Sequence, residues 1–373
     1  MIPEIIGEGT YGCVTKPSIK CRDKVITYDN KVSKIMLKED ALEEYDGMKK
    51  LSKNKNIHKY IIPQPEICKP LLNETFHDTV KKCENEVFSE TKDQDFLILV
   101  LEDGGVSLKT LTEHFFESFT EQEVHVFLSK IYHLMMGLLY FNKKGIVHHD
   151  IAARNVVYNI KTGNIRFIDF GLLKHADKMI YESKHSKNRL AKYWKNFPPE
   201  NGMANYNKFQ ISGVNMEYDS FLRRLVYTFD WFSLGYMMKS ISEELFKKTK
   251  ISTAAFKELY TYFGTLGEKN IMKRDYNIHD MTQLYKTTLL RLHIWTEDNP
   301  DPSFKSKHLQ DSLKNEKTIF PTAALSVVSS LTLKQGKSQK RFSRSSVRTK
   351  RDVIRRCKKN YKRNKITQKC VRK

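Results

Sequence analysis

The fold is decided by the stretch IVHHDIAARNVVYNIKTGNIRFIDFG, residues 146–171. Two short apolar runs within it, 156–158 and 165–168, have the composition of β-strands, and the polar segment between them contains turn residues. We therefore expect a β-hairpin. Such a hairpin would bring Asn155 and Asp169 together at one end, although they are separated in the sequence.

Three polar side chains, Asp150, Asn155 and Asp169, lie near the ends of these apolar runs and are of the types that bind metal or accept a proton at a phosphate site. Asn155 and Asp169 offer an amide oxygen and a carboxylate, which are the hard oxygen ligands that Mg²⁺ takes and commonly shares with phosphates. Asp150 is expected to lie nearby as a base. The stretch thus predicts a magnesium and phosphate site.

The spacing His-x-Asp, four residues, Asn, followed by Asp-Phe-Gly, resembles the catalytic loop and metal motif of the protein kinase superfamily. Either motif alone is weak, but both in this order with an apolar hairpin between them are a strong signal. The resemblance implies an α+β, two-lobed protein kinase fold. We expect a small β-rich N-lobe with the hinge at 1–105, a large helical C-lobe at 106–333, and a disordered basic C-terminal tail at 334–373.

A glycine-rich segment near the start of the chain resembles the kinase nucleotide loop, because a valine stands two residues after its last glycine. Glycines allow main-chain amides to approach phosphate oxygens without a side chain between them. No helical pattern follows, which argues against a dinucleotide fold. The resemblance assigns ATP contacts to Ile6, Gly7, Glu8, Gly9, Thr10, Tyr11, Gly12 and Val14, with Val14 against the adenine.

A lysine in the next apolar run resembles the kinase lysine that contacts the α- and β-phosphates. Lys34 has apolar neighbours in a predicted strand, and Lys31 and Lys38 are the alternatives. In the family, the following helix supplies a glutamate that holds this lysine. We prefer Glu44 for that role, with Glu43 as the alternative.

Apolar periodicity predicts the remaining elements that position the site. They are a helix over 41–51, one strand near Ile67 in an otherwise irregular segment 53–95 with an insertion at 73–95, a buried strand over 96–101, and a capped helix that starts at Thr120. The strand over 96–101 leads into a hinge. There the resemblance places the main chain of Glu102 and Gly104 against the adenine edge.

The segment after Gly171 is basic, and it ends in FPPE at 197–200, which resembles the end of a kinase activation segment. The later sequence DWFSLG resembles the start of the large buried helix of the lower lobe, whose aspartate, here Asp230, bonds the catalytic-loop backbone in the family. The long spacing predicts an insertion near 201–222. Arg291 is a candidate buried partner of Glu200, and an exposed helix arginine is the alternative.

Two positions depart from the usual kinase pattern. His149 stands where most kinases have arginine, so we expect weak or absent control by loop phosphorylation. Ala152 stands where serine/threonine kinases carry lysine, and AARN resembles the tyrosine-kinase loop, in which Arg154 would partly replace that lysine. Serine or threonine is the favoured acceptor, and tyrosine or dual specificity stays open.

The resemblance implies transfer of the ATP γ-phosphate to a protein hydroxyl with the help of Mg²⁺. Asp150 would accept the proton, Asn155 and Asp169 would hold the metal, and Lys34 would anchor the phosphates. The rival interpretation is a catalytically weak pseudokinase that acts as a scaffold. The presence of every required group argues against it.

Charge is concentrated at the end of the chain. The 373 residues carry a formal charge of +22, of which residues 334–373 hold +17. This tail predicts disorder and nonspecific binding of nucleic acid or another polyanion, with a solubilising role as the alternative. Cys357 and Cys370 lack two further ligands nearby, so a zinc site is not expected.

The sequence also carries signals of location. Its six cysteines show no close pairing, which favours a reducing compartment. No apolar run reaches the roughly 18 residues of a membrane span, and the N-terminus does not resemble a signal peptide. We also expect the chain to be a monomer. Residues 9–21 and the basic peptide 356–370 resemble serine/threonine kinases and other proteins of nucleocytoplasmic large DNA viruses. This implies the host cytoplasm, and leaves packaging in the virion open.

Overall fold

The computed structural model describes residues 3–9, 11–53, 55–85, 88, 91–185, 195–296, 361–363 and 370–372. The chain divides into two compact units, Met1–Asp301 and Pro302–Lys373. In the second unit, β11 (Tyr361–Arg363) pairs antiparallel with β12 (Cys370–Arg372). The rest of the basic tail lies outside the described residues, so its disorder stays a prediction.

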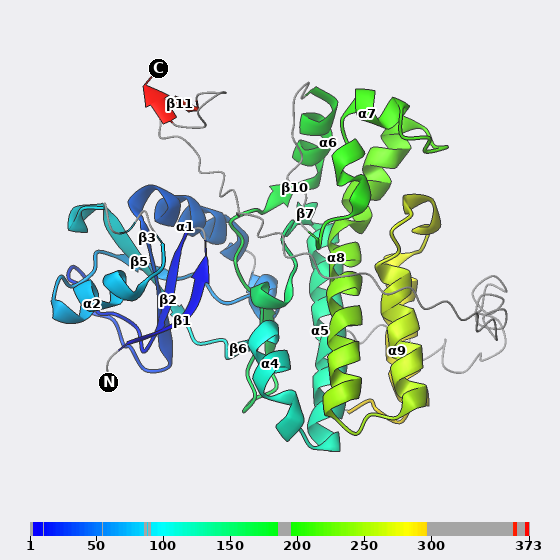
Figure 1. Ribbon diagram of the computed structural model, residues 1–373, viewed down its shortest axis with the longest axis horizontal. Coiled ribbons are helices and arrows are strands. Elements are labelled where there is room, and N and C mark those ends of the chain that lie inside the picture. The colour runs from blue at the N-terminus through cyan, green and yellow to red at the C-terminus, as the bar shows by residue number, and fades with distance from the viewer. Residues whose placement is uncertain are drawn as a thin grey trace, which may run out of the picture. The chain divides into compact units, whose positions relative to one another are not determined.

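The first unit begins with a five-stranded antiparallel sheet (Figure 1). Its strands, in spatial order, are β1 (Glu4–Gly9), β2 (Gly12–Lys16), β3 (Lys31–Leu37), β5 (Phe96–Glu102) and β4 (Glu66–Cys68). The strands expected near Ile67 and over 96–101 are confirmed. Together with helices α1 and α2, these strands form what we call the sheet part.

The register of the sheet brings its predicted functional residues onto one face. Val14 on β2 lies opposite Lys34 on β3, which in turn lies opposite Leu99 on β5. Residues directly opposite each other in an antiparallel pair project to the same side of the sheet. Val14 and Lys34 therefore share a face, as a common ligand would require.

Two helices pack with this sheet. Helix α1 (Lys38–Ser52) covers the helix expected over 41–51. Helix α2 (Glu74–Lys82) was not expected, because the segment was interpreted as irregular. Asn73 caps it by accepting a hydrogen bond from the Phe76 main-chain N–H at 3.0 Å. Phe76 is fully buried, so a single aromatic anchors an otherwise polar helix in the core.

Four of the cysteines lie in pairs, which contradicts the expectation drawn from their spacing. Cys13 forms a disulfide with Cys83, and Cys21 forms one with Cys68. The partners are 70 and 47 residues apart in the chain, and the antiparallel sheet and the position of α2 bring them together. Spacing along the sequence could not show these pairs.

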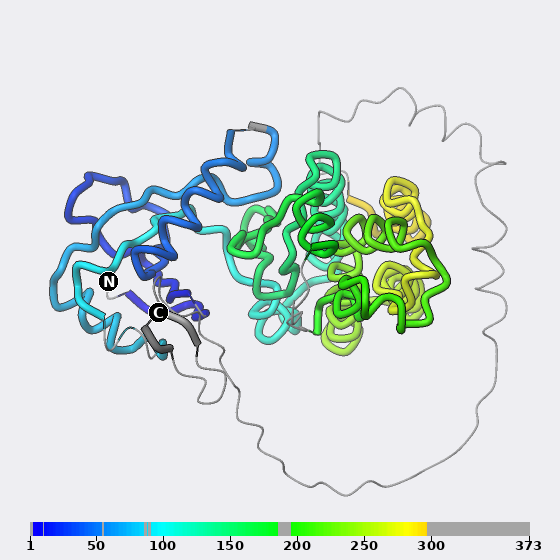
Figure 2. The backbone as a smooth tube through the Cα atoms, turned by 90° about the horizontal axis from the view of Figure 1, so that it is seen from above, coloured from blue at the N-terminus to red at the C-terminus, as the bar shows by residue number. Residues whose placement is uncertain are grey.

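The helical part follows the sheet part. Its helices are α4 (Leu108–His114), α5 (Glu121–Lys143), α6 (Ala176–His185), α7 (Tyr206–Gln210), α8 (Tyr218–Lys248), α9 (Thr253–Leu266) and α10 (Ile278–Arg291). Figure 1 shows α5, α8 and α9 running side by side, and Figure 2 shows the green and yellow helices gathered together when seen from above. Thus a β-sheet part precedes a helical part, as the α+β prediction required.

Helix α5 is the central helix of the helical part. Thr120 and Glu123 form the expected capping box at its start. Among the residues that the structure describes, α5 is the one helix long and apolar enough to cross a membrane, but 67% of its most apolar window is buried inside the protein. Core packing therefore accounts for its apolar stripe.

Short strands carry the catalytic stretch. The predicted hairpin is confirmed as β8 (Val156–Tyr158) paired with β9 (Ile165–Phe167), and β6 (Val106–Ser107) pairs with β8 on its other side. Strand β7 (Ile146–Val147) pairs with β10 (Lys174–His175). The basic segment after Gly171 contains β10 and α6, and residues 186–194 lie outside the described part.

The large buried helix starts earlier than predicted. Asp230 lies in the middle of α8, whose first residue is Tyr218 and whose N-cap is Glu217. Phe221, Leu222 and many later residues of the helix are buried. The insertion expected at 201–222 thus includes α7 and the first turns of α8, because an apolar helical pattern already begins before the recognised motif.

The buried partner of Glu200 is Arg274, so the assignment to Arg291 is wrong. Arg274 Nη2 donates to Glu200 Oε2 at 2.8 Å, and the two side chains are 0% and 7% exposed. Glu200 Oε1 also accepts the Ile271 main-chain N–H at 2.8 Å. Arg291 instead pairs with Glu258 at the surface, with 63% of the arginine side chain exposed.

We predict that Arg274→Ala lowers the free energy of unfolding by about 3–5 kcal/mol, because it leaves the Glu200 carboxylate buried without its counter-charge. Arg291→Ala is the matched control, and we expect it to change stability by about 1 kcal/mol or less, since its ion pair is exposed. Urea denaturation followed by circular dichroism measures both. Equal losses in the two variants would contradict the difference in burial.

Candidate active site

Asp230 on α8 binds the main chain of the catalytic loop. Its Oδ2 accepts the His148 main-chain N–H at 2.7 Å, and its Oδ1 accepts that of His149 at 3.0 Å. Burial raises the pKa of Asp230 above its ordinary value, against the lowering effect of His148 and of these two hydrogen bonds. The expected bond from Asp230 to the loop backbone is thus present in the structure.

Two residues of the site have left-handed backbones. His149 has φ of 66° and Asp169 has φ of 62°. Such conformations cost about 1–3 kcal/mol for a non-glycine residue, and persist where the surroundings fix them. The bonds to Asp230 fix the first, and the His149 ring packs against the rings of Phe229 at 4.6 Å and Phe197 at 4.9 Å, which also contact each other at 5.1 Å.

His148 joins the catalytic loop to the Asp-Phe-Gly segment. Its Nε2 is 3.1 Å from the main-chain oxygen of Ile168, and its ring lies 4.6 Å from that of Phe170. The ring of Phe167 lies 5.7 Å away. The fully buried imidazole therefore couples the position of Asp150 to that of Asp169.

The Asp150 carboxylate is surrounded by donors. Arg154 Nη2 lies 2.8 and 2.7 Å from its two oxygens, and Asn155 Nδ2 donates to Oδ2 at 2.9 Å. Asn196 Nδ2 donates to Oδ1 at 3.3 Å and to the Ile151 main-chain oxygen at 3.0 Å. Asp150 is 8% exposed, so these contacts fix the direction of its carboxylate.

The predicted metal ligands lie at adjoining ends of the β8–β9 hairpin. The Ile168 main-chain N–H donates to the Asn155 main-chain oxygen at 3.0 Å, which places Asp169 one residue beyond that bond. The amide nitrogen of Asn155 is directed at Asp150, so its amide oxygen is the atom left to act as a ligand. An amide oxygen and a 38%-exposed carboxylate suit a hard cation.

Lys34 sits between two carboxylates. Its Nζ lies 2.6 Å from Glu44 Oε2 and 4.0 Å from Asp169 Oδ1. Burial is the largest single influence and disfavours the ammonium ion, but the charges of Glu44 and Asp169, the hydrogen bond to Glu44 and the charge of Asp40 together outweigh it, so the pKa of Lys34 is raised. Glu43 is exposed, so Glu44 is the partner in the structure.

The three glycines of the nucleotide loop differ in their surroundings. Gly7 and Gly9 lie on β1, where an added β-carbon would make only ordinary contacts at 3.9 and 4.0 Å, whereas a β-carbon at Gly12 would collide with the Ile35 main-chain oxygen. Gly12 is therefore required by the packing of β2 on β3, independently of any ligand. Thr10 lies outside the described residues.

The hinge segment is fixed by packing and by ion pairs. Glu102 lies 3.5 Å from Arg166, and Lys16 Nζ lies 2.5 Å from Asp103. A side chain at Gly104 would collide with those of Val157 and Ile62. The adenine contacts assigned to Glu102 and Gly104 stay predictions.

Asn196 is the site residue that sequence analysis missed. It precedes the FPPE segment, and no motif marks it. Ser233 Oγ on α8 donates to its main-chain oxygen at 2.6 Å, which holds Asn196 against Asp150. The interaction joins residues from three distant segments, so only the folded chain reveals it.

This combination of a glycine-rich hairpin, an ion-paired lysine and an aspartate beside a metal-ligand pair defines a phosphotransferase of the kinase class. Comparison with known families agrees with it. The family model "Protein tyrosine and serine/threonine kinase" matches residues 1–212. The chain therefore belongs to the protein kinase family.

The individual proteins that the chain resembles share 24–30% sequence identity with it over about half of its length. The chain is 30% identical over 185 residues to "Calcium-dependent protein kinase 3" of Plasmodium yoelii yoelii, covering 48% of this chain and 28% of that protein. It is 25% identical over 183 residues to "MAP3K epsilon protein kinase 1" of Arabidopsis thaliana, covering 48% of this chain and 11% of that protein. A Dictyostelium discoideum protein named "Probable serine/threonine-protein kinase" is 24% identical over 194 residues, which are 48% of this chain and 23% of that protein. The chain thus spans less than a third of the length of each.

We predict that Asn196→Ala lowers kcat for phosphoryl transfer about 5- to 10-fold and leaves KM for ATP nearly unchanged. It removes two hydrogen bonds that orient the Asp150 segment, at about 1 kcal/mol of net effect. Steady-state kinetics measure this, with Asn207→Ala on exposed α7 as the control. A rise in KM for ATP with kcat intact would show that Asn196 acts on nucleotide binding instead.

Proposed function

We propose that this chain transfers the γ-phosphoryl group of ATP to a serine or threonine hydroxyl of a protein substrate. The observation that carries the proposal is the Asp150 carboxylate, fixed by Arg154, Asn155 and Asn196. Asp150 orients the acceptor hydroxyl and takes its proton. Positioning and electrostatics supply most of the catalysis in this reaction class.

Lys34 and the glycine-rich hairpin bind the nucleotide. The Lys34 ammonium, held by Glu44, contacts the α- and β-phosphate oxygens. Residues 6–14 cover the phosphates, and Val14 packs against the adenine from the same face of the sheet as Lys34. The hinge main chain at Glu102 and Gly104 bonds the adenine edge.

The donor set at the end of the hairpin fits Mg²⁺. Asn155 and Asp169 would hold the ion, and its charge would offset that of the β- and γ-phosphates. Lys34 lies 4.0 Å from Asp169, so the phosphate anchor and the metal ligand adjoin.

The choice of serine or threonine is supported by the Dictyostelium discoideum relative, whose name specifies that acceptor. The AARN sequence at 152–155 points the other way, since it resembles the tyrosine-kinase loop. In the structure Arg154 contacts both oxygens of Asp150, which keeps a cation beside the reacting hydroxyl where Ala152 supplies none. A scaffold without activity would not require this arrangement of donors.

The motif at residues 9–21 supports a further proposal, that the chain is a kinase of a nucleocytoplasmic large DNA virus that acts in the host cytoplasm.

We also propose that the chain is a monomer. Size-exclusion chromatography with light scattering tests the oligomeric state directly.

We predict that Asp150→Ala abolishes transfer of radiolabelled phosphate from ATP to a generic basic protein in the presence of Mg²⁺, while ATP binding persists. The variant removes the proton acceptor and leaves Lys34 and the nucleotide loop intact. Asp280→Ala, at an exposed position on α10, is the control and retains activity. Phosphorylation by the Asp150 variant would refute the assignment, and acid hydrolysis of the product identifies the labelled residue.

A second proposal concerns the basic tail, whose +17 charge would bind polyanions through release of their counterions. We predict that the full chain binds duplex DNA with an affinity that falls steeply with salt, and that removal of residues 334–373 abolishes most of this binding. Fluorescence anisotropy over a salt titration measures both proteins. Equal affinities would assign the tail a solubilising role.

A further inference from the structure

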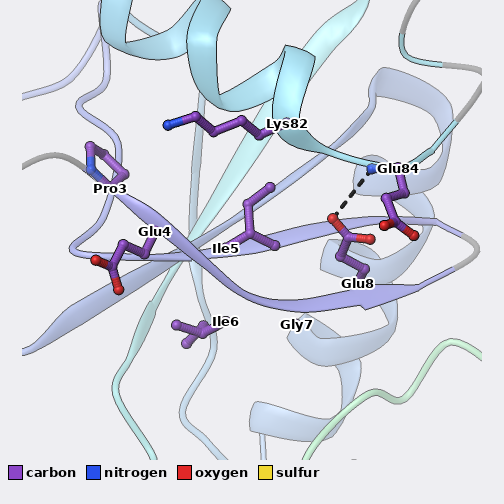
Figure 3. A pocket seen from close by; sticks show the side chains of 8 residues that line it. All are labelled: Pro3, Glu4, Ile5, Ile6, Gly7, Glu8, Lys82 and Glu84. Atoms are coloured by element: carbon purple, nitrogen blue, oxygen red, sulfur yellow. Dashed lines mark hydrogen bonds between the residues drawn. The ribbon is translucent and has the colours of Figure 1, made fainter.

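The nucleotide loop is connected to the segment that follows α2 by a disulfide and by a hydrogen bond. Cys13, the residue after Gly12, forms a disulfide with Cys83, the C-cap of α2. On the neighbouring strand, Glu8 Oε1 accepts the main-chain N–H of Glu84 at 3.3 Å (Figure 3). Both strands of the loop are therefore attached to the same two consecutive residues.

This connection lies in the core of the sheet part. Cys13 is 0% exposed and Cys83 is 7% exposed, and both pack in one cluster with Phe76, Phe88 and Phe96. Next to Cys83, β1 together with Lys82 and Glu84 lines an open hollow of about 740 Å³, in which Lys82 and Glu84 face the edge strand β1 (Figure 3). The disulfide thus joins strand β2 to the C-cap of α2 through the buried core, beside this hollow.

The strand register carries the constraint to the nucleotide site. Cys13 pairs with Ile35, and the next residue, Val14, pairs with Lys34. In the disulfide form, Lys34 is already 2.6 Å from Glu44 and 4.0 Å from Asp169. The arrangement that holds Cys13 is therefore compatible with an assembled phosphate site.

We propose that Cys13 and Cys83 form a redox-responsive tie on the nucleotide loop, and that the disulfide form binds ATP more tightly than the dithiol form. The inference rests on the proposed role of residues 6–14 in ATP binding. A loop already fixed in its binding conformation loses less conformational freedom when the nucleotide binds. Opening the disulfide restores that freedom, so the dithiol form binds ATP about 3- to 10-fold more weakly.

The chemistry is thiol–disulfide exchange with a low-molecular-weight disulfide such as oxidised glutathione. The Cys83 thiolate attacks one glutathione sulfur, forming a mixed disulfide and releasing one glutathione thiolate. The Cys13 thiolate then attacks the Cys83 sulfur and releases the second glutathione thiolate. The protein loses two protons and two electrons, and one glutathione disulfide becomes two thiols; a dithiol reductant reverses the reaction.

The second disulfide offers a matched control. Cys21 and Cys68 link the β2–β3 connection to β4 in the same sheet part, and neither residue belongs to the nucleotide loop. The variant Cys21→Ser/Cys68→Ser keeps only the proposed tie among the paired cysteines. The variant Cys13→Ser/Cys83→Ser removes the tie and keeps the control pair.

The experiment compares oxidised and dithiothreitol-reduced forms of the wild type and both variants, with thiol state verified by alkylation and mass spectrometry. A chelator selective for transition metals is present throughout together with excess Mg²⁺, because ligand atoms of Glu8, Cys13 and Cys83 lie within 4.8 Å of one another and the thiols could trap a metal. The readouts are the Kd of a fluorescent ATP analogue and amide hydrogen exchange of residues 4–16. The second readout requires no nucleotide.

We expect reduction to weaken analogue binding 3- to 10-fold and to speed exchange of residues 4–16 in the wild type and in the Cys21/Cys68 variant, with no effect in the Cys13/Cys83 variant. Equal Kd values in both forms of the Cys21/Cys68 variant would overturn the proposal, as would persistence of the effect without Cys13 and Cys83. If the Cys13→Ser/Cys83→Ser variant does not fold, the comparison of oxidised and reduced forms of the wild type and of the Cys21/Cys68 variant still tests the proposal. Absence of analogue binding in every form would refute the proposed function, and hydrogen exchange alone would then test the tie.

Discussion

The site depends on one buried carboxylate. Asp230, in the middle of α8, accepts the main-chain N–H groups of His148 and His149 at 2.7 and 3.0 Å. Leaving buried donors unpaired costs about 1–3 kcal/mol each, so the catalytic loop has one favourable position relative to this helix. Because His148 also contacts Ile168 and Phe170, that position extends to the segment carrying Asp169.

The rest of the helical part supports this anchor. Ser233, one turn beyond Asp230 on α8, holds the Asn196 main chain, and Asn196 in turn contacts Asp150. The Glu200–Arg274 pair fixes the end of the same segment against the stretch before α10. The long helix α8 therefore helps to position both Asp150 and the segment that carries Asn196. Residues along most of α8 are buried, as these contacts require.

Much of the fold could be predicted because its signals are local. The hairpin of β8 and β9, the capping box at Thr120 and the strand that carries Lys34 each depend on neighbouring residues. Helix α2 and the early start of α8 are local features that were not predicted, and the other failures concern partners distant in the chain. Arg291, which stands among leucines, is the candidate that the sequence offers for Glu200, whereas Arg274 is the C-cap of a short 3₁₀ helix that no periodicity marks. The disulfides of Cys13 and Cys21, and the contact of Asn196 with Asp150, likewise follow from tertiary packing, which spacing does not encode.

His149 shows how a departure from a family pattern acquires a physical meaning. Its ring packs in a three-ring cluster with Phe197 and Phe229, where a guanidinium would require a counter-charge. The catalytic loop is thus joined to the activation segment by the contact of His149 with Phe197 and by the hydrogen bonds of Asn196 to Asp150 and Ile151. Nearby, Lys174 lies 3.5 Å from Glu182 on α6, so a carboxylate of the chain itself already meets the cation that follows the Asp-Phe-Gly motif. An activation segment held by aromatic packing and an internal ion pair needs no added phosphate charge to keep this arrangement, which is the physical basis for expecting weak control by loop phosphorylation.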